Sequence, residues 1–141
     1  MKTVTYEEVA EILDDILKNA AGVFVATDIV VGISRGGLFP AMIVATTMEK
    51  PLAVAYIDKQ DNVYLDRAAW IRGKKVLLVD DVVRTGKTMD KTRKLLLSEG
   101  AVAVTTLAPY YLKSAERHAP DYGKVEPEDV AMPWDRCFLC E

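Results

Sequence analysis

The chain of 141 residues has few of the features that mark specialised classes of protein. No apolar run approaches the ~20 residues that a membrane-spanning helix needs. The opening residues, MKTVTYEE, lack the hydrophobic region of a signal peptide. The net charge is −3, so the composition indicates no broad basic surface of the kind that binds nucleic acid. We therefore expect a cytoplasmic protein with neither a membrane nor a nucleic acid as partner.

Cysteine and histidine are also scarce. The two cysteines, Cys137 and Cys140, form a C-x-x-C pattern near the C-terminus, and His118 is the single histidine. A C-x-x-C pattern can be a redox pair or half of a zinc site. A zinc site needs four ligands, and only His118 offers a third. The thiols are therefore either structural or incidental, or belong to a site shared across a dimer.

What is present fits one globular domain covering residues 1–141. Half of the residues are apolar and 28% are charged, as is typical of soluble globular proteins. Strand-like apolar runs alternate with helical patterns, and this alternation predicts βαβ units. The fold class is therefore α/β, with a parallel sheet of four to five strands flanked by helices. The expected helices cover residues 6–18, 38–47 and 86–99, and the expected strands cover 28–34, 52–57, 76–79 and 101–107.

The most informative stretch is Lys75–Met89, KVLLVDDVVRTGKTM. Its apolar run is typical of a strand buried on both faces, and Asp80 and Asp81 follow where such a strand leaves the sheet. Residues 84–88, RTGKT, form a polar turn before a helix, and the N-terminus of a helix favours an anion. Carboxylates suit a ligand's vicinal hydroxyls or a divalent metal. The stretch therefore predicts a site for a phosphorylated sugar.

Two simpler interpretations of this stretch exist. GKT is typical of a Walker A loop, but the glycine that such a loop needs five residues before Gly86 is replaced by Asp81. That difference excludes the ordinary phosphate-binding loop. Alternatively, two neighbouring aspartates can simply cap the loop that follows them.

A second polar turn, Ser34-Arg35-Gly36-Gly37, ends the strand expected at residues 28–34. Its glycines either let the backbone approach a ligand closely or only make a tight strand-to-helix turn. The pattern is not G-x-G-x-x-G, so a dinucleotide site is not supported. Ligands bind beyond the carboxyl ends of parallel strands. We therefore expect this turn and residues 80–88 to line one crevice.

VLLVDDVVRTGKTM resembles the phosphoribosyl-pyrophosphate signature of the type I phosphoribosyltransferases. The resemblance implies that fold, with a small hood, built from the N-terminal and C-terminal segments, over a core at about residues 20–108. It also implies Mg²⁺ as cofactor, ribose hydroxyls held by Asp80 and Asp81, and catalytic roles for these two acids and Arg35. The turn after the acids would hold the 5′-phosphate, and S-R-G-G resembles the loop that holds pyrophosphate. The implied phosphate ligands are Ser34, Arg35, Gly36, Gly37, Arg84, Thr85, Gly86, Lys87 and Thr88.

The C-terminal stretch resembles the tail of microbial and archaeal 6-oxopurine phosphoribosyltransferases. The resemblance assigns contacts with the base to Lys113, to the backbone near Val130 and to Trp134, which is either a base contact or part of the core. It places Asp135 near the pyrophosphate and the metal. Two positions depart from that branch: Asp129 stands where an aromatic residue stacks on the purine, and Arg84 stands where an aspartate acts on the purine N7 proton.

The resemblance therefore implies transfer of 5-phosphoribose to a nucleobase, most readily guanine, xanthine or hypoxanthine in purine salvage. The alternatives are another base, such as orotate, or a non-catalytic regulator that binds a nucleotide or phosphoribosyl pyrophosphate. The family commonly forms dimers or tetramers, so a homodimer or homotetramer is expected. Residues 58–72 fit a solvated hairpin with 63–65 as its returning strand, although the family keeps a mobile hood there.

Overall fold

The structure is a computed structural model that describes residues 1–135. Its strands are β1 (Lys2–Thr3), β2 (Ile29–Ile33), β3 (Leu52–Ile57), β4 (Val63–Leu65), β5 (Lys75–Val79), β6 (Val82–Val83), β7 (Ala103–Leu112), β8 (Tyr122–Glu126) and β9 (Val130–Ala131). Its α-helices are α1 (Tyr6–Asn19), α2 (Ala21–Val25), α3 (Leu38–Met48) and α4 (Lys87–Ser98), and short 3-10 helices cover Ala68–Trp70, Lys113–His118 and Pro133–Asp135.

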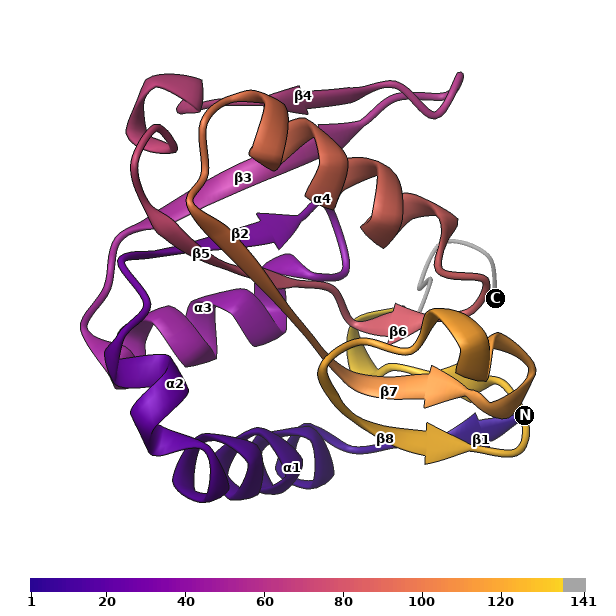
Figure 1. Ribbon diagram of the computed structural model, residues 1–141. Helices are drawn as coiled ribbons and strands as arrows, with labels where there is room; N and C mark the ends of the chain where they lie inside the picture. Colours follow the sequence, from indigo (N-terminus) through magenta and orange to yellow (C-terminus); the bar gives the residue numbers. More distant parts are fainter. Residues whose placement is uncertain (136–141) are drawn as a thin grey trace.

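The main sheet has seven strands, and Figure 1 shows how they are arranged. Its order is β4-β3-β2-β5-β7-β6, and β8 also pairs with β7. Every pairing in this sheet is parallel except that of β3 with β4. Strand β7 is long enough to pair with different neighbours along its length. Its first residues, up to Leu107, pair with β5, and the part from Leu107 to Leu112 contains the residues that pair with β6 and β8.

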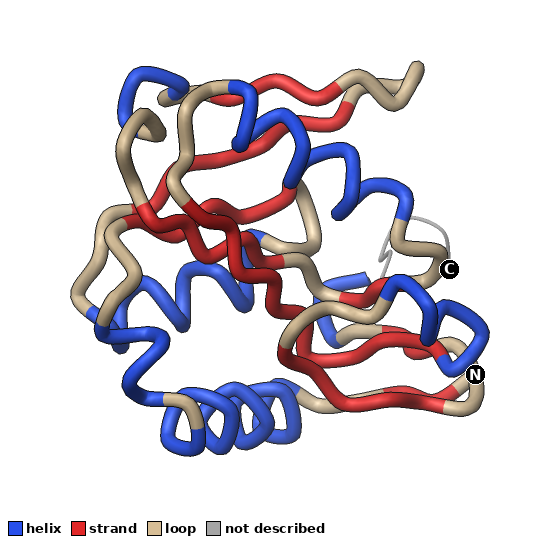
Figure 2. Tube along the Cα trace, viewed as in Figure 1, coloured by secondary structure: helices blue, strands red, loops and turns tan. Residues whose placement is uncertain are grey.

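Helices cover both faces of the central sheet, with α1 and α3 on one side and α4 on the other (Figure 2). Successive side chains of a strand point to opposite faces. On β5, Leu77 and Val79 therefore join the core that includes residues of α1 and α3, while Val76 and Leu78 join the core that includes residues of α4. A strand whose side chains are buried on both faces of the sheet has no polar side chain at any position, as is the case for β2.

The N-terminal helix forms as its sequence predicts. The Thr5 hydroxyl oxygen accepts a hydrogen bond from the Glu8 amide at 3.1 Å, which is the N-cap bond of a capping box, and the same hydroxyl donates to Glu8 Oε1 at 3.3 Å. Val9 and Leu13 lie on the face that packs against the sheet, and both are fully buried.

The two ends of the described chain lie together. Strand β1 pairs in parallel with β9, and the Lys2 ammonium lies 2.9 Å from the buried carboxylate of Glu126. These contacts hold the first residues against the segment that follows β8. The predicted division into a core at about 20–108 and a hood from the two terminal segments stays a prediction.

The sequence predicted the α/β class and the flanked parallel sheet, and both are confirmed. Strands β2, β3, β5 and β7 form the parallel core, and the hairpin predicted at 58–72 contains β4 as its returning strand. The sequence showed no period in the C-terminal stretch, yet β8 and β9 form there. Both cysteines fall outside the described residues, so their expected roles are not addressed by the structure.

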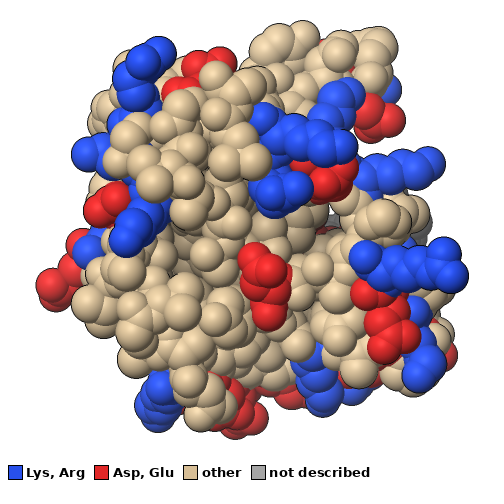
Figure 3. Space-filling model, in the orientation of Figure 1, with Lys and Arg blue, Asp and Glu red and all other residues tan. Residues whose placement is uncertain are grey.

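On the face shown in Figure 3, Lys and Arg side chains gather near α4, with acidic side chains among them. Asp90 in that helix lies 2.9 Å from the Lys94 ammonium. The surface there is therefore mixed in sign. None of the helices in the described part of the chain is both long enough and apolar enough to span a membrane.

Candidate functional site

The two polar turns singled out in the sequence lie side by side, because β2 and β5 are neighbouring parallel strands and both turns leave from their carboxyl ends. The contact between the turns is close. A Cβ atom added at Gly36 would lie 2.1 Å from Asp81 Oδ2, and one added at Gly37 would lie 2.6 Å from the Ile33 carbonyl oxygen. Only glycine fits at either position without a shift of its neighbours, so the two turns are in direct contact. The residues of the first turn are not among those that line the cavity beside the paired acids, and a crevice lined by both turns stays a prediction.

The crevice beside the second turn is a cavity of about 230 Å³ that combines acids with hydroxyl and backbone donors. Gly86 has a φ of 86° and lets the chain turn into α4, whose first residue is Lys87. The first amides of a helix have no partner within the helix, so this end can receive an anion. The lining residues are Asp80, Asp81, Val82, Val83, Arg84, Thr85, Gly86, Thr88 and Met89.

Lys87 faces a different space. It lines a cavity of about 380 Å³ between the β3–β4 hairpin and α4, together with Lys91, Thr85 and Thr88. The Lys91 ammonium donates to the Asp61 carbonyl oxygen at the tip of the hairpin. Thr85 and Thr88 therefore line both cavities. Lys87 lines only the cavity next to the hairpin, which does not contain Asp80 and Asp81.

Asp80 and Asp81 are held in place by backbone amides. The Asp81 amide donates to Asp80 Oδ1 at 2.8 Å, and the Val82 amide donates to Asp81 Oδ1 at 2.7 Å. Burial and the neighbouring charge of Asp81 raise the pKa of Asp80 well above its ordinary value. Two adjacent carboxylates that are costly to ionise together favour a bound cation.

The donor set fits Mg²⁺, which proteins commonly hold through one or two carboxylates while substrate oxygens and waters complete the octahedron. Residues 1–135 contain no cluster of three or more acidic, histidine or cysteine side chains that could hold a metal ion. Asp135, a predicted metal ligand, therefore does not join Asp80 and Asp81 in such a cluster. Its Oδ2 atom accepts a hydrogen bond from the Met132 amide at 2.9 Å. His118 packs over Gly86 and is part of no metal cluster in this range either.

Trp134 is engaged with the protein itself. Its indole N–H donates to Asp81 Oδ2 at 3.2 Å, and its ring stacks on Phe39 at 4.8 Å between centroids with an interplanar angle of 8°. The hydrogen bond links the C-terminal segment to one of the paired acids. Nothing in the local sequence signals this contact, because 53 positions separate the two residues. A contact of Trp134 with a base stays a prediction.

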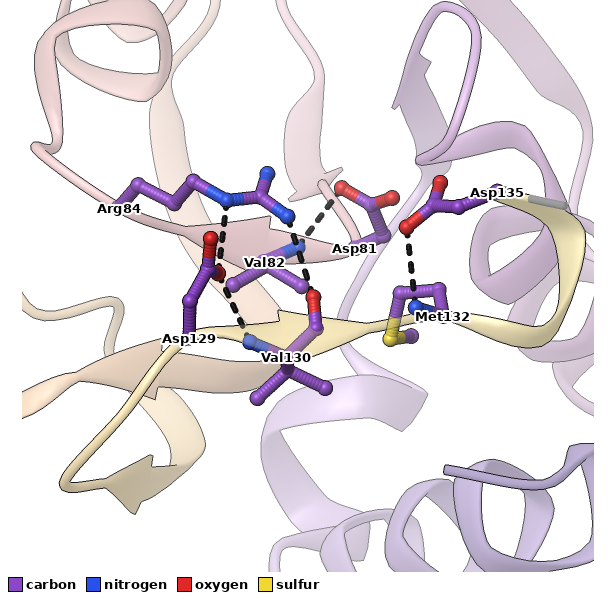
Figure 4. A network of polar contacts seen from close by, with 7 residues as sticks. All are labelled: Asp81, Val82, Arg84, Asp129, Val130, Met132 and Asp135. Atoms are coloured by element: carbon purple, nitrogen blue, oxygen red, sulfur yellow. Dashed lines mark hydrogen bonds and ion pairs between the residues drawn. The ribbon is translucent and has the colours of Figure 1, made fainter. Parts of the chain in front are cut away.

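The two departures from the 6-oxopurine pattern, Arg84 and Asp129, meet in space (Figure 4). Arg84 Nε donates to Asp129 Oδ1 at 2.9 Å, and Arg84 Nη2 donates to the Val130 carbonyl oxygen at 3.2 Å. The Val130 amide also donates to Asp129 Oδ1, at 2.8 Å. Partial burial alone would raise the pKa of Asp129, but the hydrogen bonds from Val130 and Arg84 hold that pKa below its ordinary value.

The remaining predicted site residues are more open. Arg35 is exposed on the turn after β2, and the peptide bond between Ser34 and Arg35 is cis. Lys113 is exposed where β7 ends and is not among the residues that line the cavity beside Asp80 and Asp81. The structure thus brings the paired acids, the two turns and Val130 into one region, whereas contacts of Arg35 and Lys113 with a substrate stay predictions.

Comparison with known proteins agrees with the fold. The family described as the phosphoribosyl transferase domain matches residues 4–136. Orotate phosphoribosyltransferase of Sulfurisphaera tokodaii is 33% identical over 101 residues, which cover 68% of this chain and 50% of that protein. Transcriptional regulator GfcR of Thermoplasma acidophilum is 33% identical over 103 residues, with the same coverage of 68% and 50%. The chain thus spans about half the length of these curated relatives.

A solved structure extends the likeness over the whole chain. The purine phosphoribosyltransferase of Pyrococcus horikoshii superposes with a TM-score of 0.84 over 99% of this chain and 97% of that one, at 23% identity. At this level of identity the likeness establishes a shared fold.

Proposed function

The chain belongs to the phosphoribosyl transferase domain family, and from that premise we propose that it transfers 5-phosphoribose from phosphoribosyl pyrophosphate to a ring nitrogen of a nucleobase, with release of pyrophosphate. The observation that carries the proposal is the contact between the Ser34–Gly37 turn and the paired acids at the end of β5. One turn can hold the leaving group while the acids hold the sugar, and the N-terminus of α4 receives the 5′-phosphate.

Each element has a role that its chemistry supports. The carboxylates of Asp80 and Asp81 accept hydrogen bonds from the ribose hydroxyls, and the backbone of the Ser34–Gly37 turn donates to pyrophosphate. Arg35 adds a positive charge at the leaving group, and residues 84–88 bind the 5′-phosphate. Mg²⁺, held through Asp80 and Asp81, supplies further positive charge to the phosphate oxygens when it is bound. Catalysis is then mainly positioning and electrostatic stabilisation.

For the acceptor we propose a 6-oxopurine (guanine, xanthine or hypoxanthine), as the resemblance of the C-terminal segment implies. Three observations favour other candidates. The orotate phosphoribosyltransferases among the relatives and the cationic side chain of Arg84 favour a carboxylated base. The relatives named as transcriptional regulators favour a non-catalytic protein that binds a nucleotide at this site.

We also propose a homo-oligomer, either a dimer or a tetramer. Phe39, Met42 and Ile43 expose apolar side chains on α3, and Tyr6 is exposed near Trp134. Large apolar side chains gathered on one surface are typical of contacts between protein chains. Size-exclusion chromatography with light scattering measures the state directly, and a monomer at micromolar concentration would contradict this part of the proposal.

The test of the reaction is pyrophosphate release from phosphoribosyl pyrophosphate and Mg²⁺ with a panel of bases: hypoxanthine, guanine, xanthine, adenine, uracil and orotate. We expect release with at least one base, and we expect the double variant Asp80→Asn/Asp81→Asn to lose it by at least about 100-fold. Asp14→Asn/Asp15→Asn, a pair of neighbouring aspartates exposed on α1, is the matched control and should keep full activity.

Two results would contradict the proposal. Full activity of the Asp80/Asp81 double variant would remove the acids from the reaction. Binding of phosphoribosyl pyrophosphate without pyrophosphate release from any base would favour the regulator instead.

A further inference from the structure

We propose that Trp134 is a positioning residue: its indole N–H holds the carboxylate of Asp81 in the orientation that binds phosphoribosyl pyrophosphate with Mg²⁺. The inference rests on the proposed phosphoribosyl transfer, in which Asp81 holds the ribose and the metal. The resemblance to known phosphoribosyltransferases leaves Trp134 as either a base contact or part of the core. The observation that favours a third role is the hydrogen bond from its Nε1 atom to Asp81 Oδ2 at 3.2 Å.

The Asp81 carboxylate has a donor at each of its two oxygens. The Val82 amide donates to Oδ1 at 2.7 Å, and Trp134 donates to Oδ2. A carboxylate can accept about four hydrogen bonds, so each oxygen keeps a lone pair for a ligand. The Val82 amide fixes one oxygen only and leaves the carboxylate free to rock about that contact. The hydrogen bond from Trp134 therefore sets the plane of the carboxylate.

The indole is itself fixed by two helices. Its ring stacks on Phe39 at 4.8 Å between centroids, with 8° between the planes, and lies 6.1 Å from the Tyr6 ring, tilted by 54°. Phe39 belongs to α3, which begins directly after the Ser34–Gly37 turn, and Tyr6 is the first residue of α1. A ligand-binding group is held most precisely when the donor behind it is packed in place. The two rings give Trp134 that packing.

The segment that carries Trp134 does not need the bond to Asp81 for its own fold. The Met132 amide donates to Asp135 Oδ2 at 2.9 Å, and the Asp135 amide donates to the Met132 carbonyl oxygen at 3.0 Å. Figure 4 shows Asp81 with the Val82 amide on one side and this contact between Met132 and Asp135 on the other. The turn is closed by its own two hydrogen bonds, so the indole N–H is available to act on the acid.

Neither simpler role accounts for the contact. An indole has a single donor, which Asp81 already uses, and one face of the ring is covered by Phe39, so little of Trp134 remains for a base. Phenylalanine would stack on Phe39 as tryptophan does, so packing alone does not require an N–H group at this position. What tryptophan adds is a donor directed at one of the paired acids.

The test uses Trp134→Phe, which keeps a ring that can stack but removes the donor. We expect the dissociation constant for phosphoribosyl pyrophosphate with Mg²⁺, measured by calorimetry, to rise by at least about tenfold, as for other groups that orient a metal-binding side chain. At saturating phosphoribosyl pyrophosphate, KM for the accepted base should stay nearly the same. An unchanged dissociation constant would overturn the proposal. A change confined to KM for the base would also overturn it, because Trp134 would then contact the base.

Thr27→Val is the matched control for a loss of stability alone. The Thr27 hydroxyl is buried and donates to the Val23 carbonyl oxygen at 3.3 Å, close to the amino end of β2 and so at the opposite end of that strand from the Ser34–Gly37 turn. Valine has nearly the same shape and lacks the donor. We expect this variant to unfold at a lower temperature and to bind phosphoribosyl pyrophosphate as the wild type does. Binding weakened to the same extent in both variants would refute the positioning role.

The hydrogen bond can be observed directly in the protein without ligands, by NMR of the indole protons. The chain has two tryptophans, and Trp70, which is 46% exposed and lies under the guanidinium of Arg67, supplies the reference signal. A proton donated to a carboxylate is deshielded more than one donated to a neutral amide. Asp81→Asn should therefore move the Trp134 indole proton upfield and leave that of Trp70 in place. A Trp134 signal that does not respond would overturn the inference even if Trp134→Phe fails to fold.

The outcomes separate this inference from the proposed function. A wild-type protein that binds phosphoribosyl pyrophosphate, together with a Trp134→Phe variant that binds it equally well, refutes the role of Trp134 and leaves the proposed transfer intact. A wild-type protein that binds no phosphoribosyl pyrophosphate refutes the proposed function itself, and the inference with it.

Discussion

Replacing Asp80 by asparagine should stabilise the fold while it destroys the site. Burial and the charge of Asp81 raise the pKa of Asp80 well above the ordinary value of 3.8. The folded chain thus holds a proton that the unfolded chain has already released. The stability that this proton provides is fully present below the ordinary carboxyl pKa and is lost as the pH rises through the raised one.

Burial and the charge of Asp81 also determine how much stability the substitution of Asp80 should add. Each tenfold change in proton affinity corresponds to about 1.4 kcal/mol, and two unit charges a few ångströms apart near a protein surface repel by a few kcal/mol. We therefore expect Asp80→Asn to raise the free energy of unfolding at neutral pH by roughly 1–3 kcal/mol. For a domain of this size, about 3 °C in Tm corresponds to each kcal/mol. Asparagine keeps the oxygen that accepts the Asp81 amide, so no backbone bond is lost.

The assay is thermal unfolding of wild type and variant across pH 3–8. The two curves should coincide near pH 3, where Asp80 is protonated, and separate as the pH rises. Magnesium with phosphoribosyl pyrophosphate should raise the Tm of the wild type only, because ligand binding stabilises the state that binds. A variant less stable than the wild type at neutral pH, or a difference that does not depend on pH, would refute the reasoning about the paired charges.

Three other substitutions test contacts near the site and in the core. Gly36→Ala places a Cβ atom 2.1 Å from Asp81 Oδ2 and should weaken binding of phosphoribosyl pyrophosphate by at least about tenfold in calorimetry, whereas Gly22→Ala, with no atom within 4 Å of the new Cβ, should not change it. Tyr110→Phe removes a buried hydroxyl that has no partner within residues 1–135 and whose pKa burial raises to about 12. It should raise the free energy of unfolding in urea by about 1 kcal/mol, and a loss would show that the hydroxyl is satisfied. Trp134→Phe keeps a stacking ring but removes the indole N–H, and should lower stability by about 1 kcal/mol in the same assay; no loss would mean that the hydrogen bond to Asp81 contributes nothing.

The sequence determined the fold class because its signals are local. A strand buried on both faces must be apolar at consecutive positions, and β2 and β5 are recognisable for that reason. The capping box at Thr5 marks the start of α1 in the same way. Strands β6 and β9 have two residues each and no period of their own, so their pairing depends on where β7 and β1 already lie. Short strands of this kind are specified by tertiary contacts rather than by pattern.

The residues of the candidate site fall into the same two groups: those that local sequence signals predict and those that only the fold brings together. Asp80, Asp81 and residues 84–88 are close in sequence, and the end of one strand and the start of one helix suffice to bring them together. Arg84 and Asp129 are 45 positions apart, and each taken alone conflicts with the purine pattern. Arg84 directly follows β6 and Asp129 directly precedes β9, and the fold brings the two side chains within 2.9 Å of each other. Two departures from a motif that are separate in the sequence can therefore be the two partners of one interaction in the folded chain. For that reason, the absence of an expected residue from a motif is weak evidence against a function until the spatial neighbours of that position are known.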